Sequence, residues 1–513
     1  MDKDEIKIGK HLLDVLTIGM YQDPIIIYRE YIQNSVDAIE ACKIKGIFDN
    51  YINNPIYIEI KKQEKAISIY DTGIGLKSSL FYSTLTSIAA STKKIDSNIG
   101  FRGIGRLAGI AYCSTLTMKS SYYGENTASI LRWDAQKIRD SLRADKMIEA
   151  IDLINNTTES FTEKEDTDKH YFEVILSDVN NQELLEEQKV IEYISQVCPV
   201  EFDSKFVFKT KIRNFLDNYN LKLKEYYIIV NKKEVKKNYG TDIYKIASNK
   251  KKKHDEIVDI NHFVIYNDSK IIAFCWYALT RKLQLIPKLN YPGIKFRQNN
   301  FQIGRSDVLR ELFEPQERFV NYFIGELHIF ENTIIPNAQR NYFEDSPEFR
   351  FLMRETRKYI KDLNSLCKLA SDINSLNNAS EDYNAQKSKY DENKQTNSFI
   401  NKKHEESSYD ALVKTHEELE KKRNDLDHRI ERISSKIVKD GIKKVYPPRI
   451  STNTIITNES QDNHEKKKYA VSDLSKLDRK EKKLLSKVFA IINETMTSDV
   501  AENLIFAIKM KLK

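Results

Sequence analysis

The stretch YREYIQNSVDAIEAC, from Tyr28 to Cys42, has the pattern of an amphipathic helix. At helical spacing Glu30, Asn34 and Asp37 share one face, whereas the isoleucine and valine residues point largely elsewhere. Glutamate can orient and deprotonate a water molecule, an asparagine oxygen suits Mg²⁺, and aspartate accepts hydrogen bonds. The polar face therefore either carries chemistry or is simply solvated, as it is on many surface helices.

A second motif, DTGIG, occupies residues 71–75 and follows the alternating run AISIY. Alternation predicts a strand, and a polar turn joins it to an earlier alternating run, so that residues 55–70 form a hairpin. The hairpin would place Asp71 at a strand end, where Gly73 and Gly75 allow a ligand to approach the backbone closely. On its own, such a glycine motif is more often an ordinary turn.

A third motif, GFRGIG at residues 100–105, is followed by RLAGIA, which has the pattern of a helix start. Gly100, Gly103 and Gly105 would form a loop whose backbone N–H groups face phosphate. A turn without a ligand explains a single motif of this kind more often than not. The three motifs in this order are far more specific than any one of them.

The order ExxxNxxDA, DxGxG and GxxGxG resembles the GHKL superfamily of ATPases, which includes gyrase, the heat-shock protein 90 chaperones, histidine kinases and MutL. Within that set, HLLDVLTIGMYQDPIIIYREYIQNSVDAIEACK resembles the first helices of the heat-shock protein 90 family. Residues 84–94, TLTSIAASTKK, resemble the segment that leads into the ATP lid of that family. The resemblance implies an α+β fold with a Bergerat-type ATP-binding sandwich, in which helices cover a mixed or antiparallel sheet.

The resemblance also implies ATP and Mg²⁺ as ligands and a role for each motif residue. Asp71 would accept a hydrogen bond from the adenine amino group, and Asn34 would hold Mg²⁺ between the phosphates. Glu30 would activate the attacking water, and Asp37 would belong to the nucleotide-binding face. Lys93, in the lid segment, would either reach phosphate or stay solvated. The glycine loop at 100–105 would cradle the phosphates.

One position departs from the pattern of the family. Related ATPases usually place a Gly-Thr pair just before the strand that is predicted here at Tyr171–Leu176. The corresponding residues of this chain are Lys169-His170. Whether His170 or Thr167 takes the place of that threonine is open on the sequence alone.

The segment RFVNYFIGELHIFENTIIPNAQRNYFE, residues 318–344, resembles the middle domain of the same chaperone family. In that domain a loop carries an asparagine and, three residues later, an arginine that reaches the ATP γ-phosphate, which correspond here to Asn337 and Arg340. A planar, permanently charged guanidinium suits the charge that develops on a transferred phosphoryl group. A surface arginine beside a proline turn is the alternative.

Residues 1–200 are thus predicted as the ATPase domain and residues 201–363 as an α/β middle domain. The middle-domain strands are expected at Tyr226–Val230, His262–Tyr266, Ile271–Tyr277 and Gly293–Phe296. The lysine run at 250–253 falls between strand candidates. A solvated loop is favoured there over a nucleic-acid contact.

The remainder of the chain is predicted to be helical or extended. Residues 364–441 combine a solvated helix or linker with a heptad pattern that favours a coiled coil or a helical hairpin, or one helix packed on the middle domain. This heptad helix is expected to stop at Asp440-Gly441, and its core positions are Leu412, Leu419, Leu426 and Ile433. Residues 442–470 are a predicted linker, and residues 471–513 are predicted as two amphipathic helices that bind a partner or a second copy.

Composition limits the class of protein. The chain has 513 residues, enough for several domains, and 82 basic against 75 acidic residues give a net charge of +7, which is compatible with nucleic-acid contact without demanding it. Five scattered cysteines favour a reducing compartment over a disulfide framework. No signal-peptide core and no apolar run of about 18 residues is found, so a cytoplasmic protein that does not enter membranes is expected.

These observations predict an ATPase whose hydrolysis is slow and conformationally gated. ATP-gated closure or dimerisation would make it a molecular clamp or chaperone that acts on proteins. One alternative is a nucleic-acid clamp resembling the MORC or MutL ATPases, in a bacterial antiviral defence system. Another is a nucleotide-responsive scaffold whose protein partner binds the C-terminal helices.

Overall fold

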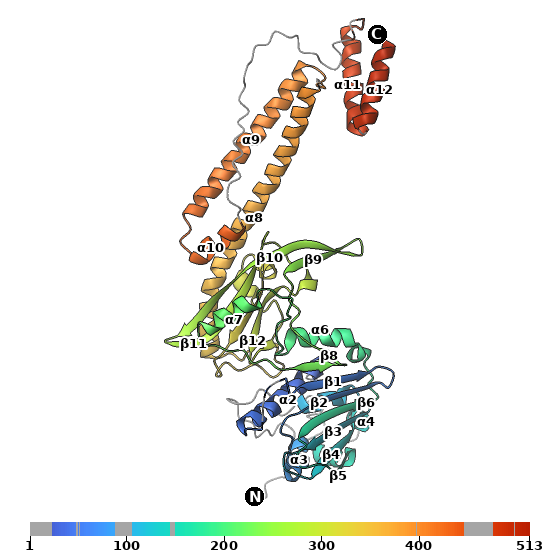
Figure 1. Cartoon of the computed structure of the whole chain (residues 1–513), viewed down its shortest axis with the longest axis vertical. Helices are drawn as coiled ribbons and strands as arrows, with labels where there is room; N and C mark the ends of the chain where they lie inside the picture. Colours follow the sequence, from blue (N-terminus) through green and yellow to red (C-terminus); the bar gives the residue numbers. More distant parts are fainter. Residues whose placement is uncertain are drawn as a thin grey trace, which may run out of the picture. The chain divides into compact units, whose positions relative to one another are not determined.

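The structure, a computed structural model, describes residues 23–47, 50, 52–87, 105–143, 149–396, 398–445, 474, 476–496 and 498–512. The chain divides into two compact units, Met1–Asn364 and Ser365–Lys513. The first part of the run that resembles the first helices of the chaperone family, residues 11–22, lies outside the described residues. The elements of both units are labelled in Figure 1.

An eight-stranded sheet, called the first sheet below, begins the first unit. Its strand order is β5-β4-β3-β6-β2-β1-β7-β8, and all neighbouring strands are antiparallel except β1 and β7. The predicted hairpin at 55–70 and the strand predicted at 171–176 are confirmed. The strands are β1 (Ile56–Lys61), β2 (Ala66–Asp71), β3 (Thr115–Ser121), β4 (Thr127–Asp134), β5 (Thr158–Lys164), β6 (Tyr171–Ser177), β7 (Ile228–Val230) and β8 (Lys233–Glu234).

Helices cover the apolar face of this sheet, as an α+β fold requires. Along β1 and β2 every second residue is buried, so each of these strands presents one apolar face, and α2 packs onto it through its isoleucines and Val36. The glycine-rich loop leads into a 3₁₀-helix. The helical elements are α2 (Ile26–Ile44), α3 (Ser78–Thr86), η1 (Gly105–Ala111), α4 (Ala135–Arg143), α5 (Ala150–Thr157), η2 (Gln182–Leu185) and α6 (Glu187–Val197).

The strand at Ile228–Val230 was assigned to the wrong sheet by the sequence analysis. It pairs in parallel with β1, so that Ile56 lies opposite Ile228. Tyr226 and Val235, on either side of β7, join the apolar core of the first sheet. A parallel partner so distant in the sequence leaves no local signal, because only burial in the folded chain selects it.

A six-stranded sheet, called the second sheet below, has the order β13-β12-β14-β11-β10-β9. Three of the strands predicted after residue 200 are confirmed in it. Its strands are β9 (Asp242–Ala247), β10 (Lys250–Asn267), β11 (Lys270–Thr280), β12 (Gly293–Gln298), β13 (Phe301–Ile303) and β14 (Ile324–Ile329). The helical elements around them are α7 (Lys209–Asp217), η3 (Lys288–Asn290), η4 (Arg310–Phe313) and η5 (Glu317–Tyr322).

The solvated loop that was expected at residues 250–253 is wrong. These lysines are the first four residues of β10, and all four side chains are exposed. Charged residues are usually depleted in strands because strand side chains pack on a half-buried surface. A strand segment with no sheet behind it escapes that rule, and Lys250–Lys253 pair with β9 alone, whereas β10 pairs with β11 only from Ile257 onward.

The second unit contains a helical hairpin formed by the end of α8 (Pro347–Gln395) and α9 (Lys402–Glu431). Tyr383 lies 5.3 Å from His416 between ring centroids, and Asp372 lies 2.8 Å from Arg429. From the first contact to the second, the residue number on α9 rises from 416 to 429 while that on α8 falls from 383 to 372. The two helices are therefore antiparallel. Of the alternatives for residues 364–441, the hairpin is the one found, and Leu412, Leu419 and Leu426 are its buried positions.

The predicted helix stop at Asp440-Gly441 is wrong. The break falls after Glu431, and Gly441 lies inside a separate helix, α10 (Lys436–Val445). A Cβ at Gly441 would lie 2.7 Å from Leu366, so this glycine lets α10 approach α8 closely rather than ending a helix.

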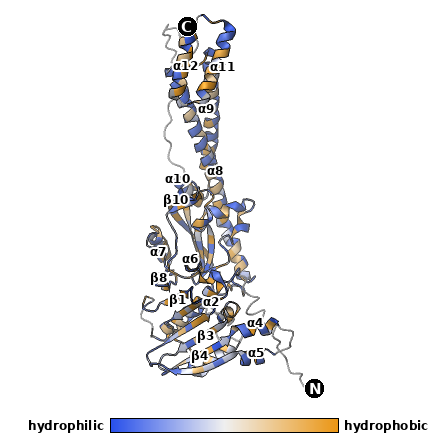
Figure 2. Ribbon diagram, turned by 90° about the vertical axis from the view of Figure 1, so that its right-hand side faces the viewer, coloured by the Kyte–Doolittle hydropathy of each residue, from blue (hydrophilic) through white to orange (hydrophobic). Residues whose placement is uncertain are grey.

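The two predicted C-terminal helices are present as α11 (Arg479–Thr495) and α12 (Ser498–Leu512). Asp478 and Glu481 form a capping box at the start of α11. Phe489, Ile492 and Ala501 are buried between the helices, and both carry hydrophobic as well as hydrophilic residues along their length (Figure 2). None of the helices within the described residues is both long and apolar enough to cross a membrane.

Candidate active site

The polar face of α2 is buried rather than solvated. Glu30 is 9% exposed, Asp37 is 7% exposed and Gln33 is 1% exposed, while Asn34 is half-buried. Charged and amide groups are kept out of water only where other groups compensate them. The interpretation of this face as an ordinary solvated surface is therefore excluded.

The DTGIG motif packs on the C-terminal half of α2. Asp71 ends β2 with 2% exposure, and its Oδ1 accepts a hydrogen bond of 2.8 Å from the Gly73 amide. The Ile74 amide donates to the carbonyl of Ala38 at 3.3 Å, and a Cβ at Gly73 would collide with Ala38. Gly75 has φ of +72° and sits against the carbonyl of Ser121. Glycine at 73 and 75 is thus required for this close packing.

His170, and not Thr167, is the residue that contacts this motif. The Nδ1 of His170 lies 2.9 Å from the carbonyl oxygen of Gly73, and its ring meets Tyr123 edge-on at 5.6 Å between centroids. Thr167 contributes its backbone carbonyl to the Gly124 amide at 3.0 Å. The chain departs from the family pattern at Lys169-His170, and there the imidazole of His170 contacts the DTGIG motif.

The glycine-rich loop reaches the other end of α2. A Cβ at Gly105 would collide with the Glu30 carboxylate, and the Tyr31 hydroxyl accepts a 2.9 Å hydrogen bond from the Gly109 amide. Because Gly105 opens η1 at Glu30 and Gly73 lies at Ala38, about two helical turns separate the two motifs, with Asn34 midway. Lys93, Gly100 and Gly103 lie outside the described residues.

Arg340 extends from the loop after β14 to Glu30. Its Nε lies 3.9 Å from Glu30 Oε1, and both side chains are 11% exposed, which contradicts a surface arginine. Arg340 has φ of +54°, and its amide donates to the carbonyl of Asn337 while its own carbonyl accepts from the Gly304 amide, each at 3.0 Å. Asn337 therefore shapes the turn that presents Arg340.

A second arginine was missed by the sequence analysis. Arg29 Nη2 lies 3.2 Å from Glu30 Oε1 and 3.3 Å from the backbone carbonyl of Gln339, so it joins α2 to the loop that carries Arg340. Arg29 is only 6% exposed. The sequence shows only that Arg29 is a charged residue next to Glu30. Its burial depends on a loop some 310 residues away in the sequence, which sequence reasoning does not reveal.

Comparison with known proteins agrees with this geometry. Residues 26–167 match the sequence model of the family described as histidine kinase-, DNA gyrase B- and HSP90-like ATPases. This segment is a GHKL-type ATPase domain. It contains α2, the DTGIG motif and the glycine-rich loop, and it ends just before β6.

Relatives that match part of the chain include several proteins named chaperone protein HtpG. The protein from Acinetobacter baylyi is 29% identical over 139 residues, which cover 24% of this chain and 22% of the relative. The one from Clostridium acetobutylicum is 35% identical over 88 residues, covering 16% and 14%. The one from Natranaerobius thermophilus is 29% identical over 146 residues, covering 25% and 23%. The chain thus spans about a quarter or less of the length of these relatives.

The polar groups beside α2 and the DTGIG motif are compatible with a bound nucleotide. Among the described residues, the side-chain amide of Gln33 and the buried hydroxyl of Thr72 have no hydrogen-bond partner, although they flank Asn34 and Asp71. Buried polar groups without partners are rare unless a ligand satisfies them. No cluster of three His, Cys, Asp or Glu side chains in the described ranges is placed to bind a metal. A metal here would be held by Asn34 and by phosphate oxygens.

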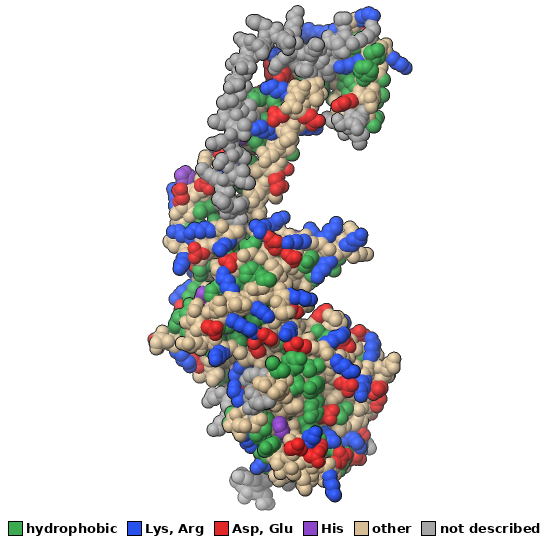
Figure 3. All heavy atoms as spheres, viewed as in Figure 1, with side chains coloured by type: hydrophobic (Ala, Val, Ile, Leu, Met, Phe, Trp, Pro, Cys, Tyr) green, Lys and Arg blue, Asp and Glu red, His purple; other side chains and the backbone are tan. Residues whose placement is uncertain are grey.

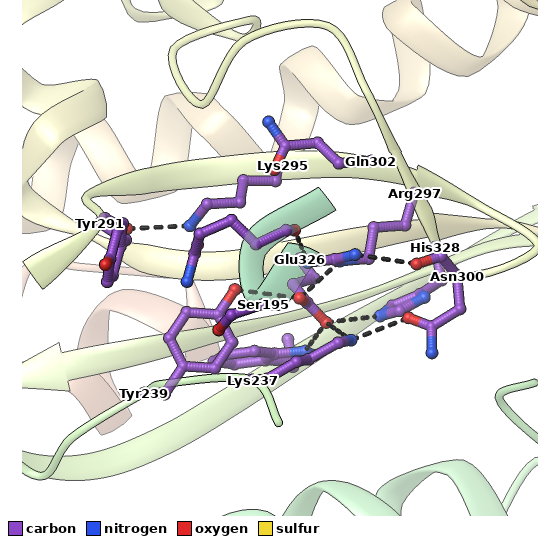
Figure 4. A network of polar contacts seen from close by, with 12 residues as sticks. Ser195, Lys237, Tyr239, Tyr291, Lys295, Arg297, Asn300, Gln302, Glu326 and His328 are labelled. Atoms are coloured by element: carbon purple, nitrogen blue, oxygen red, sulfur yellow. Dashed lines mark hydrogen bonds and ion pairs between the residues drawn. The ribbon is translucent and has the colours of Figure 1, made fainter. Parts of the chain in front are cut away.

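A buried ionic cluster joins the second sheet to the ATPase domain (Figure 4). At its centre is Glu326 of β14, which is 0% exposed. Its carboxylate accepts hydrogen bonds from Arg297, Lys237, Tyr239, Trp276 and His328. Arg297, on β12, also donates to the carbonyl of Gln196 on α6 at 2.6 Å. The cluster therefore anchors β12 to the ATPase domain.

The β12–β13 hairpin links this ionic cluster to Arg340. Its tip is Asn299–Asn300, and Phe301 joins the apolar core of the first sheet. At the other end of β13, Gly304 holds the carbonyl of Arg340. The position of Arg340 near Glu30 thus depends on strands that are anchored to both sheets.

Lys295 in this cluster predicts a pH-dependent stability. Burial, with Arg297 and Lys237 nearby, lowers the pKa of Lys295 to about 7, against the weaker opposing effect of Glu326. Between pH 7 and 9 the unfolded chain then binds more protons than the folded chain, so stability rises with pH. We expect Lys295→Met to be more stable than wild type at pH 7, by roughly 1–3 kcal/mol, and the gain to shrink by pH 9.

Thermal unfolding of both proteins at pH 7, 8 and 9 measures this difference. Lys270→Met is the matched control, since Lys270 is on the same sheet but 65% exposed. A constant difference between Lys295→Met and wild type over this pH range would contradict the lowered pKa of Lys295.

Proposed function

We propose that this protein binds Mg-ATP in its ATPase domain and hydrolyses it slowly. The rate would be limited by the movement of Arg340 toward the phosphoryl group. The observation that supports this most directly is the meeting of three elements at one carboxylate. Glu30 lies against Gly105 of the glycine-rich loop, beside Arg29 of α2 and near Arg340 of the loop after β14.

Some of these residues would bind the nucleotide, and others would take part in its hydrolysis. Asp71 accepts from the adenine amino group, and the backbone around Gly73 and Gly75 comes close to the nucleotide. Glu30 orients the attacking water and takes its proton. Arg340 stabilises the charge that develops on the γ-phosphoryl oxygens. Magnesium, held by Asn34, would neutralise phosphate charge when bound.

The proposed slowness follows from the ion pair between Arg340 and Glu30. A guanidinium that rests near the carboxylate must shift toward the phosphoryl group before hydrolysis, while Arg29 keeps Glu30 paired. Such a step depends on the loop that is held by β13 and Gly304. Turnover would therefore be gated by a change of conformation rather than by the chemical step.

We further propose that the protein works as a cytoplasmic homodimer, with nucleotide-driven closure acting on a client. Large hydrophobic side chains remain exposed on the C-terminal helices, among them Leu484, Ile491 and Phe506, at 58–66% exposure. Such residues favour a protein partner or a second copy over a solvated tail. Sedimentation of the full chain with and without ATP tests the dimer, and suppression of client aggregation tests the chaperone role.

Asp71→Asn tests the nucleotide site. Asparagine keeps an oxygen for the Gly73 amide but turns the second acceptor into a donor that faces the adenine amino group. Because hydrogen bonds to a charged group contribute about 1.5–3 kcal/mol, ATP affinity should fall roughly 10- to 100-fold. Titration calorimetry with ATP measures it, with Asp152→Asn, an exposed aspartate on α5, as the control.

Equal affinity of Asp71→Asn and wild type for ATP would remove Asp71 from the nucleotide site. Wild-type protein that binds ATP but hydrolyses none, even with Mg²⁺ present, would make the chain a nucleotide sensor instead of an ATPase.

A further inference from the structure

β9 and the first residues of β10 form a two-stranded ribbon, residues 242–256, called the basic ribbon below. β10 pairs with β9 from Lys250 to Glu256 and with β11 only from Ile257 onward. Ser248 and Asn249, at the turn, have φ of 52° and 58°, as in a tight two-residue hairpin. The ribbon therefore extends beyond the second sheet, as Figure 1 shows.

The end of the basic ribbon carries positive charge without compensation. Lys245, Lys250, Lys251 and Lys252 are exposed, and none of them forms an ion pair with any described acidic residue. The fifth lysine, Lys253, is paired with Asp242 and Glu256 at the base. Residues 243–252 contain four lysines and no acidic residue. Lysine and arginine side chains surround the projecting ribbon in Figure 3.

The strand register places three of these four lysines, Lys245, Lys250 and Lys252, on one face. Lys245 lies directly opposite Lys252, and Lys250 lies opposite Ala247 on the same side of the ribbon. Like charges that face each other across strands destabilise a hairpin. Residues two apart on a strand are about 6.6 Å apart, so Lys250 and Lys252 form a regular row. This arrangement costs the free ribbon stability, and a polyanion would relieve the repulsion.

The other face of the ribbon differs. Lys251 Nζ lies 4.4 Å from the centre of the Tyr244 ring, and Lys251 stands opposite Ile246. Ile246 is 70% exposed and is the one large hydrophobic residue that is exposed among the described residues of the ribbon. A membrane-binding surface needs a broader apolar face than this, and lysine is depleted in the cores of protein–protein interfaces.

We propose that the basic ribbon binds the phosphate backbone of double-stranded nucleic acid. Lysines are the usual partners of backbone phosphates, and such contacts set position without reading sequence. The major groove of B-DNA, about 12 Å wide, admits a two-stranded β-ribbon. Binding of nucleic acid by the ribbon does not depend on ATP hydrolysis. If the protein closes as a clamp, as proposed above, nucleic acid is the molecule that the closed clamp would hold.

Salt dependence supplies a quantitative expectation. If the four lysines each neutralise one phosphate, the logarithm of the binding constant falls with the logarithm of salt concentration with a slope of about −3.6 from the ribbon alone. Fluorescence anisotropy of a labelled 25-base-pair DNA duplex with the full chain, without nucleotide, measures this slope between about 50 and 200 mM salt.

The test compares two variants with the same change in charge. One carries Gln in place of Lys245, Lys250, Lys251 and Lys252. The control carries Gln in place of four exposed lysines elsewhere in the first unit, Lys164, Lys169, Lys222 and Lys288. We expect the ribbon variant to lose at least tenfold in affinity at 50 mM salt and about 3.6 units of slope. The control variant should lose little of either.

Equal losses in both variants would mean attraction by net charge alone and would overturn the proposal, as would unchanged binding in the ribbon variant. Preferential loss of binding to anionic lipid vesicles, with DNA binding intact, would also overturn it. The ribbon variant should have a melting temperature no lower than that of wild type, because like-charge repulsion is removed, and it should keep basal ATP hydrolysis, since its four substituted lysines belong to the ribbon and not to the candidate active site. The DNA-binding measurement therefore tests the ribbon even if the protein does not hydrolyse ATP.

Discussion

Glu30→Ala should bind ATP with nearly wild-type affinity and hydrolyse it roughly 10²- to 10⁴-fold more slowly. A positioned general base contributes about that factor to a proton-transfer reaction. Glu30 lies against Gly105 and between two arginines, at the N-terminal half of α2, whereas Asp71 and the DTGIG loop meet α2 at Ala38. Adenine recognition and water activation therefore involve different ends of one helix, and they should separate in a mutant.

Binding and single-turnover hydrolysis of radiolabelled ATP measure the two effects. Glu30→Gln should behave in the same way while it still accepts a hydrogen bond from Arg29, which keeps that buried guanidinium paired. Glu40→Gln is the control on the same helix, about three turns further along, where Glu40 Oε1 accepts a hydrogen bond from the Tyr226 hydroxyl. Hydrolysis at the wild-type rate in both Glu30 variants would exclude Glu30 as the base.

Arg340→Ala should keep ATP affinity within a few-fold and lower turnover at least 100-fold. Arginines that stabilise phosphoryl-transfer transition states contribute factors of about 10³–10⁵. Arg340 comes from the loop after β14 and lies near Glu30, whereas the proposed adenine contact is at Asp71, so we expect most binding contacts to remain in the variant. Arg340→Lys should restore little, because an ammonium lacks the planar fork of a guanidinium.

The control for Arg340 is Arg305→Ala, whose side chain is 89% exposed close to the same loop. A double variant, Glu30→Ala with Arg340→Ala, should be little slower than Glu30→Ala alone, since both residues act on the same step. Full additivity of the two effects, or normal turnover in Arg340→Ala, would place Arg340 outside the catalytic step.

Much of the fold was predictable where the signal is local. The helix at Ile26–Ile44, the hairpin that ends in Asp71 and the two C-terminal helices follow from hydrophobic periods of 3.6 and 2 that neighbouring residues create. Two of the wrong predictions involve contacts with distant segments: Ile228–Val230 joins the first sheet, and Gly441 of α10 packs on Leu366. The third is local, because Lys250–Lys253 lie in a hairpin whose exposed lysines carry no hydrophobic strand signal.

The sequence by itself determined the candidate residues of the site, since Glu30, Asn34, Asp71 and the glycines lie in short motifs whose spacing is set by one helix and one strand. Only the tertiary structure decided what surrounds them. It buried the polar face of α2, put His170 on the Gly73 carbonyl and brought Arg29 and Arg340 to one carboxylate. The physical reason is that burial and ion pairing arise between segments hundreds of residues apart, which no local period records.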